Sequence, residues 1–210
     1  VKWKWKKKVA IINFGMGNLN SVQISLNYLA IKNDVIDNPK NIFDYSHIVL
    51  PGVGSFKKAI RNLKKNGFFN TLLQASRNKN QKILGICLGM QLLFESSTEE
   101  GSSKGLGILK GKVEKFSFSK DKNIKIPHVG FNQVFFNKKN TFYKDISTNS
   151  DFYFDHSYRV KDFSDDLNSG VTCYGEKFLS SFNKENIFGT QFHPEKSQSN
   201  GLLILRNFLR

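Results

Sequence analysis

The chain has 210 residues, of which 39% are hydrophobic, a size and composition that suit one globular domain rather than a disordered or membrane-spanning protein. The net charge is +15, but the lysines are scattered and accompany no helix-turn-helix, zinc-finger or aromatic RNA-binding motif, so charge alone does not predict a nucleic-acid-binding protein. Cys87 and Cys173 make no disulfide framework, which favours the reducing cytoplasm. We expect a basic tail at residues 1–7 and a single domain over residues 8–210. The apolar run that follows the tail is too short for the hydrophobic region of a signal peptide.

Strands and helices alternate in the first hundred residues. The apolar runs predict strands at residues 8–14, 34–37, 47–50 and 82–84. Helical spacing predicts an amphipathic helix around Val22 to Leu29, helices at 56–65 and 68–77, and a further helix from Met90 that includes Glu95 and ends near Ser96. This alternation is typical of a mostly parallel sheet that is covered on both faces.

After Gly101 the helical pattern gives way to short strands and polar turns. The strand candidates are residues 106–118, 131–136, 151–160, 171–174, 178–183 and 186–191. Polar connections are expected at 137–150 and 162–170, and a helix at about 199–209 closes the chain. No internal repeat or linker divides the sequence.

The sequence Gly-Ile-Cys-Leu-Gly at residues 85–89 lies between a predicted strand and a predicted helix. A nucleophile between two glycines at such a switch is typical of a nucleophile elbow, in which a tight turn lifts the side chain clear of the sheet edge. A helix N-terminus there favours a thiolate over a thiol. We therefore predict that Cys87 is a nucleophile and not an inert buried thiol.

A thiolate nucleophile requires a base, and the His-Pro-Glu sequence at residues 193–195 offers one. Residues two apart in an extended segment point to the same side, so His193 and Glu195 share a face. His193 can take the proton from Cys87, and Glu195 can orient and stabilise the imidazolium. The sequence thus predicts a Cys-His-Glu triad.

The loop Pro-Gly-Val-Gly at residues 51–54 follows a predicted strand, where ligand sites of α/β sheets form. Acyl transfer requires two N–H donors for the tetrahedral oxyanion. We predict the N–H groups of Leu88 and Val53. A Gly-Met-Gly loop at residues 15–17 is too incomplete to predict dinucleotide binding.

These motifs resemble those of class I glutamine amidotransferases, in order and over residues 8–210. Further stretches at residues 14–19, 127–132 and 153–158 are similar to the glutaminase subunit of imidazole glycerol phosphate synthase. The resemblance implies a flavodoxin-like, three-layer α/β fold, whose central sheet is mostly parallel and gains antiparallel strands in the C-terminal half.

The resemblance implies an enzyme of histidine biosynthesis that hydrolyses glutamine to glutamate and ammonia. The ammonia would pass to a (β/α)8-barrel cyclase subunit, the partner in a heterodimer, which makes imidazole glycerol phosphate and an aminoimidazole carboxamide ribotide. No cofactor and no metal is implied. The peptides of the loop at 52–54 are expected to adopt the productive orientation only when the cyclase is bound, because glycines make a peptide flip easy.

The resemblance also assigns residues. It places the triad at Cys87, His193 and Glu195. The implied glutamine-binding positions are Gly52, Gly54, Gln91, Glu95, Ser157 and Tyr158. The positions expected to face the cyclase and the ammonia path are Asn18, Phe131, Tyr153 and Lys196. Phe131 stands where tryptophan is usual, and Asp155 stands where an apolar residue is usual.

Four other functions compete with this one. The first is a paralogous glutaminase subunit that supplies ammonia for amino or amidino sugars of surface glycans. The others are a non-catalytic regulatory subunit, a nucleic-acid-binding protein and a stand-alone cysteine hydrolase. The intact Cys-His-Glu set argues against the regulatory subunit, whereas one sequence does not separate the two pathways.

Overall fold

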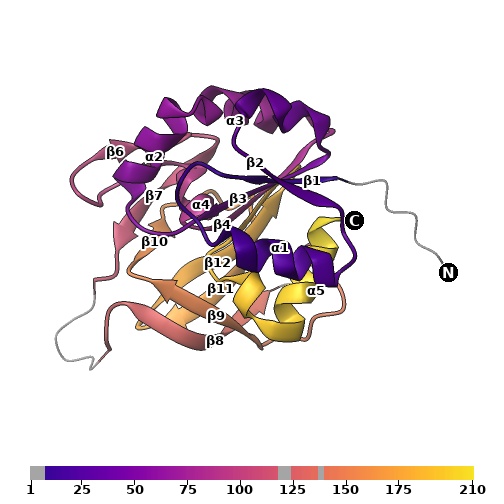
Figure 1. The fold of residues 1–210 in the computed structure, drawn as a ribbon. Helices are drawn as coiled ribbons and strands as arrows, with labels where there is room; N and C mark the ends of the chain where they lie inside the picture. Colours follow the sequence, from indigo (N-terminus) through magenta and orange to yellow (C-terminus); the bar gives the residue numbers. More distant parts are fainter. Residues whose placement is uncertain (1–7, 118–123, 137–139) are drawn as a thin grey trace.

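The computed structural model describes residues 8–117, 124–136 and 140–210, so the predicted tail at 1–7 lies outside the described residues. A nine-stranded sheet forms the middle layer and carries helices on both faces (Figure 1). A smaller four-stranded sheet packs on the face that carries α2 and α3. This arrangement confirms the predicted three-layer α/β fold. None of the helices in these residues combines the length and apolar character that crossing a membrane requires.

One half of the large sheet is parallel. Its five strands, in order across the sheet, are β2 (Asn33–Ile36), β1 (Val9–Ile12), β3 (His47–Gly52), β4 (Lys82–Cys87) and β13 (Ile187–Thr190). Successive residues of β1 enter opposite cores: Val9 and Ile11 contact one, and Ala10 and Ile12 the other. The strand is buried on both faces, which explains its continuous apolar run.

Four helices cover this parallel half. On one face lie α1 (Leu19–Tyr28) and α5 (Gln198–Phe208), and on the other α2 (Phe56–Lys65) and α3 (Phe68–Arg77). Ser55 caps α2 by accepting a hydrogen bond from the Lys58 N–H, and the buried side chains Phe56, Ile60 and Leu63 lie on one stripe of that helix. These four helices agree closely with the predicted ones.

The other half of the large sheet is antiparallel. It consists of β12 (Glu176–Lys184), β11 (Asn168–Tyr174), β8 (His128–Phe136) and β9 (Ser150–His156). The four-stranded sheet has the order β10 (Tyr158–Lys161), β7 (Leu109–Lys115), β5 (Phe94–Ser97) and β6 (Ser103–Lys104). Three short 3-10 helices complete the described fold, at Pro39–Asp44, Thr141–Tyr143 and Pro194–Lys196.

Two predicted elements are wrong in detail. The helix expected from Met90 to about Ser96 ends at Leu92, and β5 follows at once. Phe94 is fully buried and pairs with Leu109 of β7, so long-range pairing overrides the local helical spacing. The single strand expected at residues 151–160 is two strands, β9 and β10, which belong to different sheets and are separated at Ser157.

Candidate active site

Cys87 occupies a strained turn between β4 and the five-residue helix α4 (Leu88–Leu92). Its backbone has φ 53° and ψ −111°, outside the regions that a side chain normally allows. A Cβ atom on Gly89 would lie 1.8 Å from the Leu50 carbonyl oxygen, and one on Gly85 would lie 2.6 Å from the Gly89 carbonyl oxygen. Both glycines are therefore required by close packing, as a nucleophile elbow demands.

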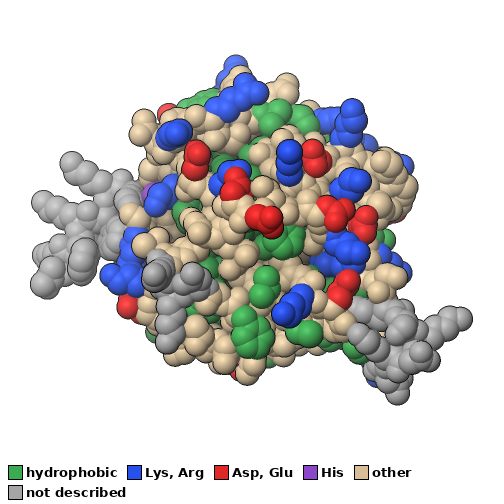
Figure 2. Space-filling model, turned by 180° about the vertical axis from the view of Figure 1, so that it is seen from behind, with side chains coloured by type: hydrophobic (Ala, Val, Ile, Leu, Met, Phe, Trp, Pro, Cys, Tyr) green, Lys and Arg blue, Asp and Glu red, His purple; other side chains and the backbone are tan. Residues whose placement is uncertain are grey.

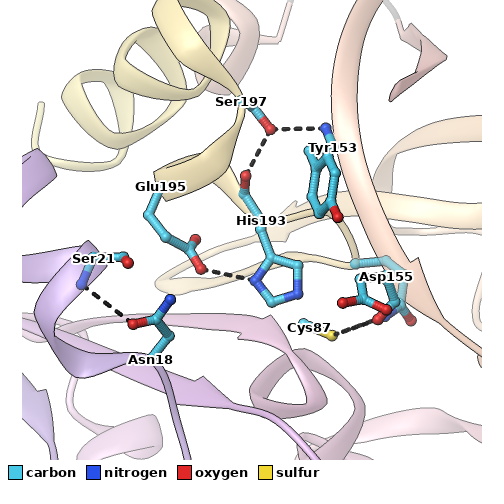
Figure 3. Close-up of polar contacts among 9 residues, drawn as sticks. Asn18, Ser21, Cys87, Tyr153, Asp155, His193, Glu195 and Ser197 are labelled. Carbon is cyan, nitrogen blue, oxygen red and sulfur yellow. Dashed lines mark hydrogen bonds and ion pairs between the residues drawn. The ribbon is translucent and has the colours of Figure 1, made fainter. Parts of the chain in front are cut away.

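The chain brings His193 beside Cys87 through strand pairing. β13 runs parallel to β4, with Thr190 opposite Ile86, so the residues that follow β13 emerge next to the elbow. The His193 N–H donates to the Tyr153 carbonyl at 2.8 Å and anchors the segment. The Cys87 sulfur lies beside the His193 imidazole in Figure 3, and both residues line one pocket.

Glu195 completes this cluster from behind the histidine. Its Oε1 lies 2.7 Å from His193 Nδ1, and the two side chains are only 2% and 3% exposed (Figure 3). Burial alone lowers the pKa of His193, but the charge and hydrogen bond of the Cys87 sulfur and the Glu195 carboxylate together raise that pKa to about 10. The imidazole is thus held in its charged form beside the Cys87 sulfur.

Two buried glutamines form a chain of contacts that ends at the sulfur. Gln191 Nε2 is 3.7 Å from Cys87 Sγ, and Gln191 Oε1 accepts from Gln91 Nε2 at 2.9 Å. Gln91 Nε2 also donates to the Tyr158 carbonyl at 3.0 Å. Gln191 was not predicted as a site residue, although it begins the segment that carries His193.

A pocket of about 470 Å³ opens over Cys87. The predicted residues that line it are Val53, Gly54, Cys87, Leu88, Gln91, Ser157, Tyr158, His193 and Lys196. Gly52 lies beneath it, opposite Cys87 in the β3–β4 register and against the Gly89 N–H. Gly54 has φ +95°, a left-handed conformation that favours glycine.

Glu95 does not lie in this pocket. The prediction placed Gln91 and Glu95 on one helix face, but the helix ends before Glu95, whose exposed carboxylate accepts from the Gly111 N–H at 3.1 Å. Two acidic residues line the pocket instead: the exposed Asp155, and the partly buried Glu99, whose carboxylate accepts from the Phe56 N–H at 2.7 Å. Burial raises the pKa of Glu99, the Phe56 N–H lowers it, and the nearby Glu100 raises it. The sequence prediction missed Glu99 because it assumed that the helix continues past Leu92.

The residues predicted to face a partner lie on a surface continuous with the pocket. Phe131 is 52% exposed and its ring packs edge-on against Tyr153 at 5.6 Å. The Lys196 ammonium lies 5.3 Å from the centre of the Tyr153 ring, and Lys196 also lines the pocket. Asn18 caps α1 and lies beside Glu195 in Figure 3.

Two further observations concern charge. Asp155 is exposed at the pocket edge, and it is not among the groups that shift the pKa of His156. Basic side chains on the face shown in Figure 2 are dispersed among acidic ones and form no single patch. Within the described residues, no group of three or more His, Cys, Asp or Glu side chains is arranged to hold a metal ion.

Comparison with known proteins agrees with this geometry. The family model for class I glutamine amidotransferases matches residues 10–210. The chain is 46% identical over 202 residues to imidazole glycerol phosphate synthase subunit HisH 1 of Campylobacter jejuni, covering 96% of this chain and 99% of that protein. It is 41% identical over 202 residues to subunit HisH of Moorella thermoacetica, covering 96% and 94%.

Solved structures share the fold at low sequence identity. A crystal structure described as a glutamine amidotransferase superposes with a TM-score of 0.74 at 13% identity and covers 96% of each chain. The structure of PurLQS from Thermotoga maritima superposes with a TM-score of 0.72 at 18% identity and covers 97% of this chain and 98% of that chain.

Proposed function

The chain belongs to the class I glutamine amidotransferase family, and we propose that it is the glutaminase subunit of an imidazole glycerol phosphate synthase, acting in the cytoplasm in histidine biosynthesis. The near full-length identity to HisH subunits supports the pathway. One observation carries the chemistry: the Cys87 sulfur lies beside the His193 imidazole, which contacts the Glu195 carboxylate on its other nitrogen.

The first half of the reaction uses the ion pair. The Cys87 thiolate attacks the carboxamide carbon of glutamine, and the oxyanion that forms accepts from the N–H groups of Leu88 and Val53. Charged His193 then donates its proton to the leaving ammonia, and a thioester remains on Cys87. The raised pKa of His193 supports this step, because the acid is loaded before substrate arrives.

The second half reverses the role of the histidine. In the thioester Cys87 is uncharged, so two contributions that raise the pKa of His193, the charge and the hydrogen bond of the sulfur, are gone. Burial still lowers the pKa of His193, and only Glu195 still raises it, so the pKa falls. The neutral ring can then take a proton from water. The hydroxide formed cleaves the thioester to glutamate.

Glutamine is held along the pocket wall. The ammonium of the substrate pairs with the Glu99 carboxylate, which takes the role that the sequence prediction gave to Glu95. Gln91 uses both N–H hydrogens on the Tyr158 carbonyl and Gln191, so the group it offers glutamine is its own carbonyl oxygen. Backbone groups of Ser157 complete the site, with Gly52 and Gly54 shaping the opposite wall.

Ammonia leaves through the face around Lys196, where the cyclase subunit binds. Exposed Phe131 and half-buried Tyr153 supply the apolar part of that interface, and Asn18 lies at its edge beside Glu195. Binding of the cyclase orients the peptides of the loop at 52–54 so that the Val53 N–H faces the oxyanion. The glutaminase is therefore slow until the partner and its ligand are present.

A coupled assay tests the proposal. The candidate cyclase subunit, its ribonucleotide substrate and glutamine are mixed with and without this chain, and imidazole glycerol phosphate is measured. We expect product only with this chain present. Product from a sugar-amidating partner instead, with none from the cyclase, would favour the glycan-pathway alternative. Full glutaminase activity without any partner would favour a stand-alone hydrolase.

A further inference from the structure

Two buried histidines, of which His156 lines the pocket, take no part in the reaction steps above. His128 begins β8 and His156 ends β9, and the two residues pair directly in the strand register. They are 3% and 6% exposed, and His128 Nδ1 lies 3.1 Å from His156 Nε2. Such a pair of imidazoles works only if one nitrogen donates and the other accepts.

The backbone decides which nitrogen donates. His156 Nδ1 lies 2.8 Å from the Tyr158 carbonyl oxygen, and a carbonyl only accepts. His156 therefore carries its hydrogen on Nδ1, which leaves Nε2 as an acceptor in the neutral ring. His128 must then donate from Nδ1.

Asn132, at the other end of this chain of hydrogen bonds, specifies the same tautomer. Asn132 Oδ1 accepts from the Gln133 N–H at 2.8 Å, and its amide nitrogen donates to the Cys173 carbonyl at 3.3 Å. This orientation directs the amide nitrogen to His128 Nε2, 3.2 Å away, so that nitrogen is an acceptor. Both ends thus specify the Nδ1–H form of both rings.

The surroundings keep the two rings neutral. The His128 ring stacks on the rings of Tyr174 and Phe154, with distances between ring centres of 3.9 Å and 4.7 Å. Burial lowers the pKa of His128 to about 4. Burial also lowers the pKa of His156 to about 3, with the Tyr158 carbonyl opposing and the charges of His128, His193 and Arg159 adding to the decrease. An added proton would also place two N–H groups face to face.

The Tyr158 carbonyl links these histidines to Gln91 in the substrate pocket through two hydrogen bonds. It accepts from His156 on one side and from Gln91 Nε2, at 3.0 Å, on the other. Gln91 in turn donates to Gln191, which contacts Cys87 Sγ at 3.7 Å. Both lone pairs of one backbone oxygen are therefore used to fix the direction of a pocket side chain.

We propose that His128 and His156 are positioning residues for glutamine binding: in the Nδ1–H form they hold the Tyr158 carbonyl, which holds Gln91 with its oxygen toward the substrate. This inference rests on the proposed glutaminase function. It assigns the two histidines a share of the substrate affinity and none of the proton transfer.

Two matched substitutions test this. In His156→Asn the amide nitrogen takes the place of Nδ1 and keeps the bond to Tyr158, whereas in His156→Gln it takes the place of Nε2 and loses that bond. We expect His156→Gln to raise the KM for glutamine about fivefold, the effect of one neutral hydrogen bond, with kcat changed less than twofold. His156→Asn should stay within about twofold in KM. Equal KM values for the two variants would overturn the proposal.

Two further measurements keep the test decisive if a variant folds poorly. His128→Phe preserves the stacking and removes the donor but leaves the His156 bond to Tyr158 in place, so we expect a KM between those of His156→Asn and His156→Gln. Imidazole nitrogen NMR of the wild-type chain should show both rings as Nδ1–H forms at pH 7.5, and an Nε2–H form for either would overturn the proposal. This spectrum needs no activity, so a wild-type chain that lacks glutaminase would contradict the proposed function alone.

Discussion

Three histidines of this molecule, His128, His156 and His193, are buried to a similar degree. His193 is nevertheless charged, whereas His128 and His156 are neutral. The pKa of His193 is raised to about 10, whereas the pKa values of His128 and His156 are lowered to about 4 and about 3. Burial lowers the pKa in all three cases. The difference lies in the neighbours: the Cys87 sulfur and the Glu195 carboxylate raise the pKa of His193, whereas His128 and His156 contact neutral donors and acceptors. The partners of a buried histidine, and not its depth, therefore decide its charge.

Removing the anionic partner is the strongest test of this comparison. Cys87→Ala deletes the nucleophile, so we expect glutaminase activity to fall by ~10⁴-fold or more. Cyclase-stimulated glutamate release measures the loss, and binding of the cyclase subunit should persist because the surface around Phe131 is unchanged. Retention of most turnover would refute the assignment of Cys87.

Changing the second anionic partner has a smaller effect. Glu195→Gln preserves a hydrogen bond to His193 Nδ1 but removes the charge, so the imidazolium is less stable. We expect kcat to fall roughly 10²-fold, the lower end of the range for a lost general acid–base contribution. A kcat within a factor of two of the wild type would mean that Glu195 is not coupled to His193.

The parallel half of the molecule was largely predictable from sequence. Buried apolar strands, the glycines around Cys87 and the His-Pro-Glu segment are local signals, and the structure places their side chains together. The antiparallel half was predictable only as a set of strands. Its register decides that His128 meets His156, and the start of β10 in the smaller sheet decides that the Tyr158 carbonyl meets Gln91. Both contacts join residues tens of positions apart.

Glu95 shows the same limit in a single residue. Its spacing from Gln91 is correct for a helix, but the pairing of Phe94 with β7 ends the helix, turns Glu95 away and lets Glu99 line the pocket. The local sequence does not predict the early end of the helix, because its cause is β7, a partner strand that lies further along the chain.

The two carboxylates therefore make a matched pair of substitutions. Glu99→Gln removes the charge opposite the substrate ammonium, and we expect the KM for glutamine to rise about tenfold, the low end for a charged hydrogen bond. Glu95→Gln is the control and should leave KM within about twofold. The reverse ranking would restore the prediction made from helical spacing.

The opposite charge states also predict how stability varies with pH. His128 and His156 have folded pKa values below the unfolded value of 6.5, so the unfolded chain binds more protons and stability falls as the pH drops from about 6.5 towards 4. His193 has a folded pKa above 6.5, so its contribution is complete below 6.5 and is lost as the pH rises towards 10.

Thermal unfolding over this pH range measures both limbs. We expect Tm to be highest near neutral pH and to fall by several degrees or more on each side. In His128→Phe the acid limb should be shallower and the alkaline limb unchanged. An equal change in both limbs would show that the two histidine environments are not independent.

The charge of His193 is the quantity on which the proposed chemistry depends most directly. Imidazole nitrogen NMR of the wild-type chain and of Cys87→Ala, titrated from pH 6 to 10, would measure it. We predict that wild-type His193 stays doubly protonated through pH 8 and that its pKa falls clearly once the sulfur is gone. A neutral His193 in the wild type at pH 7, or the same pKa in both proteins, would contradict the ion pair at the centre of the site.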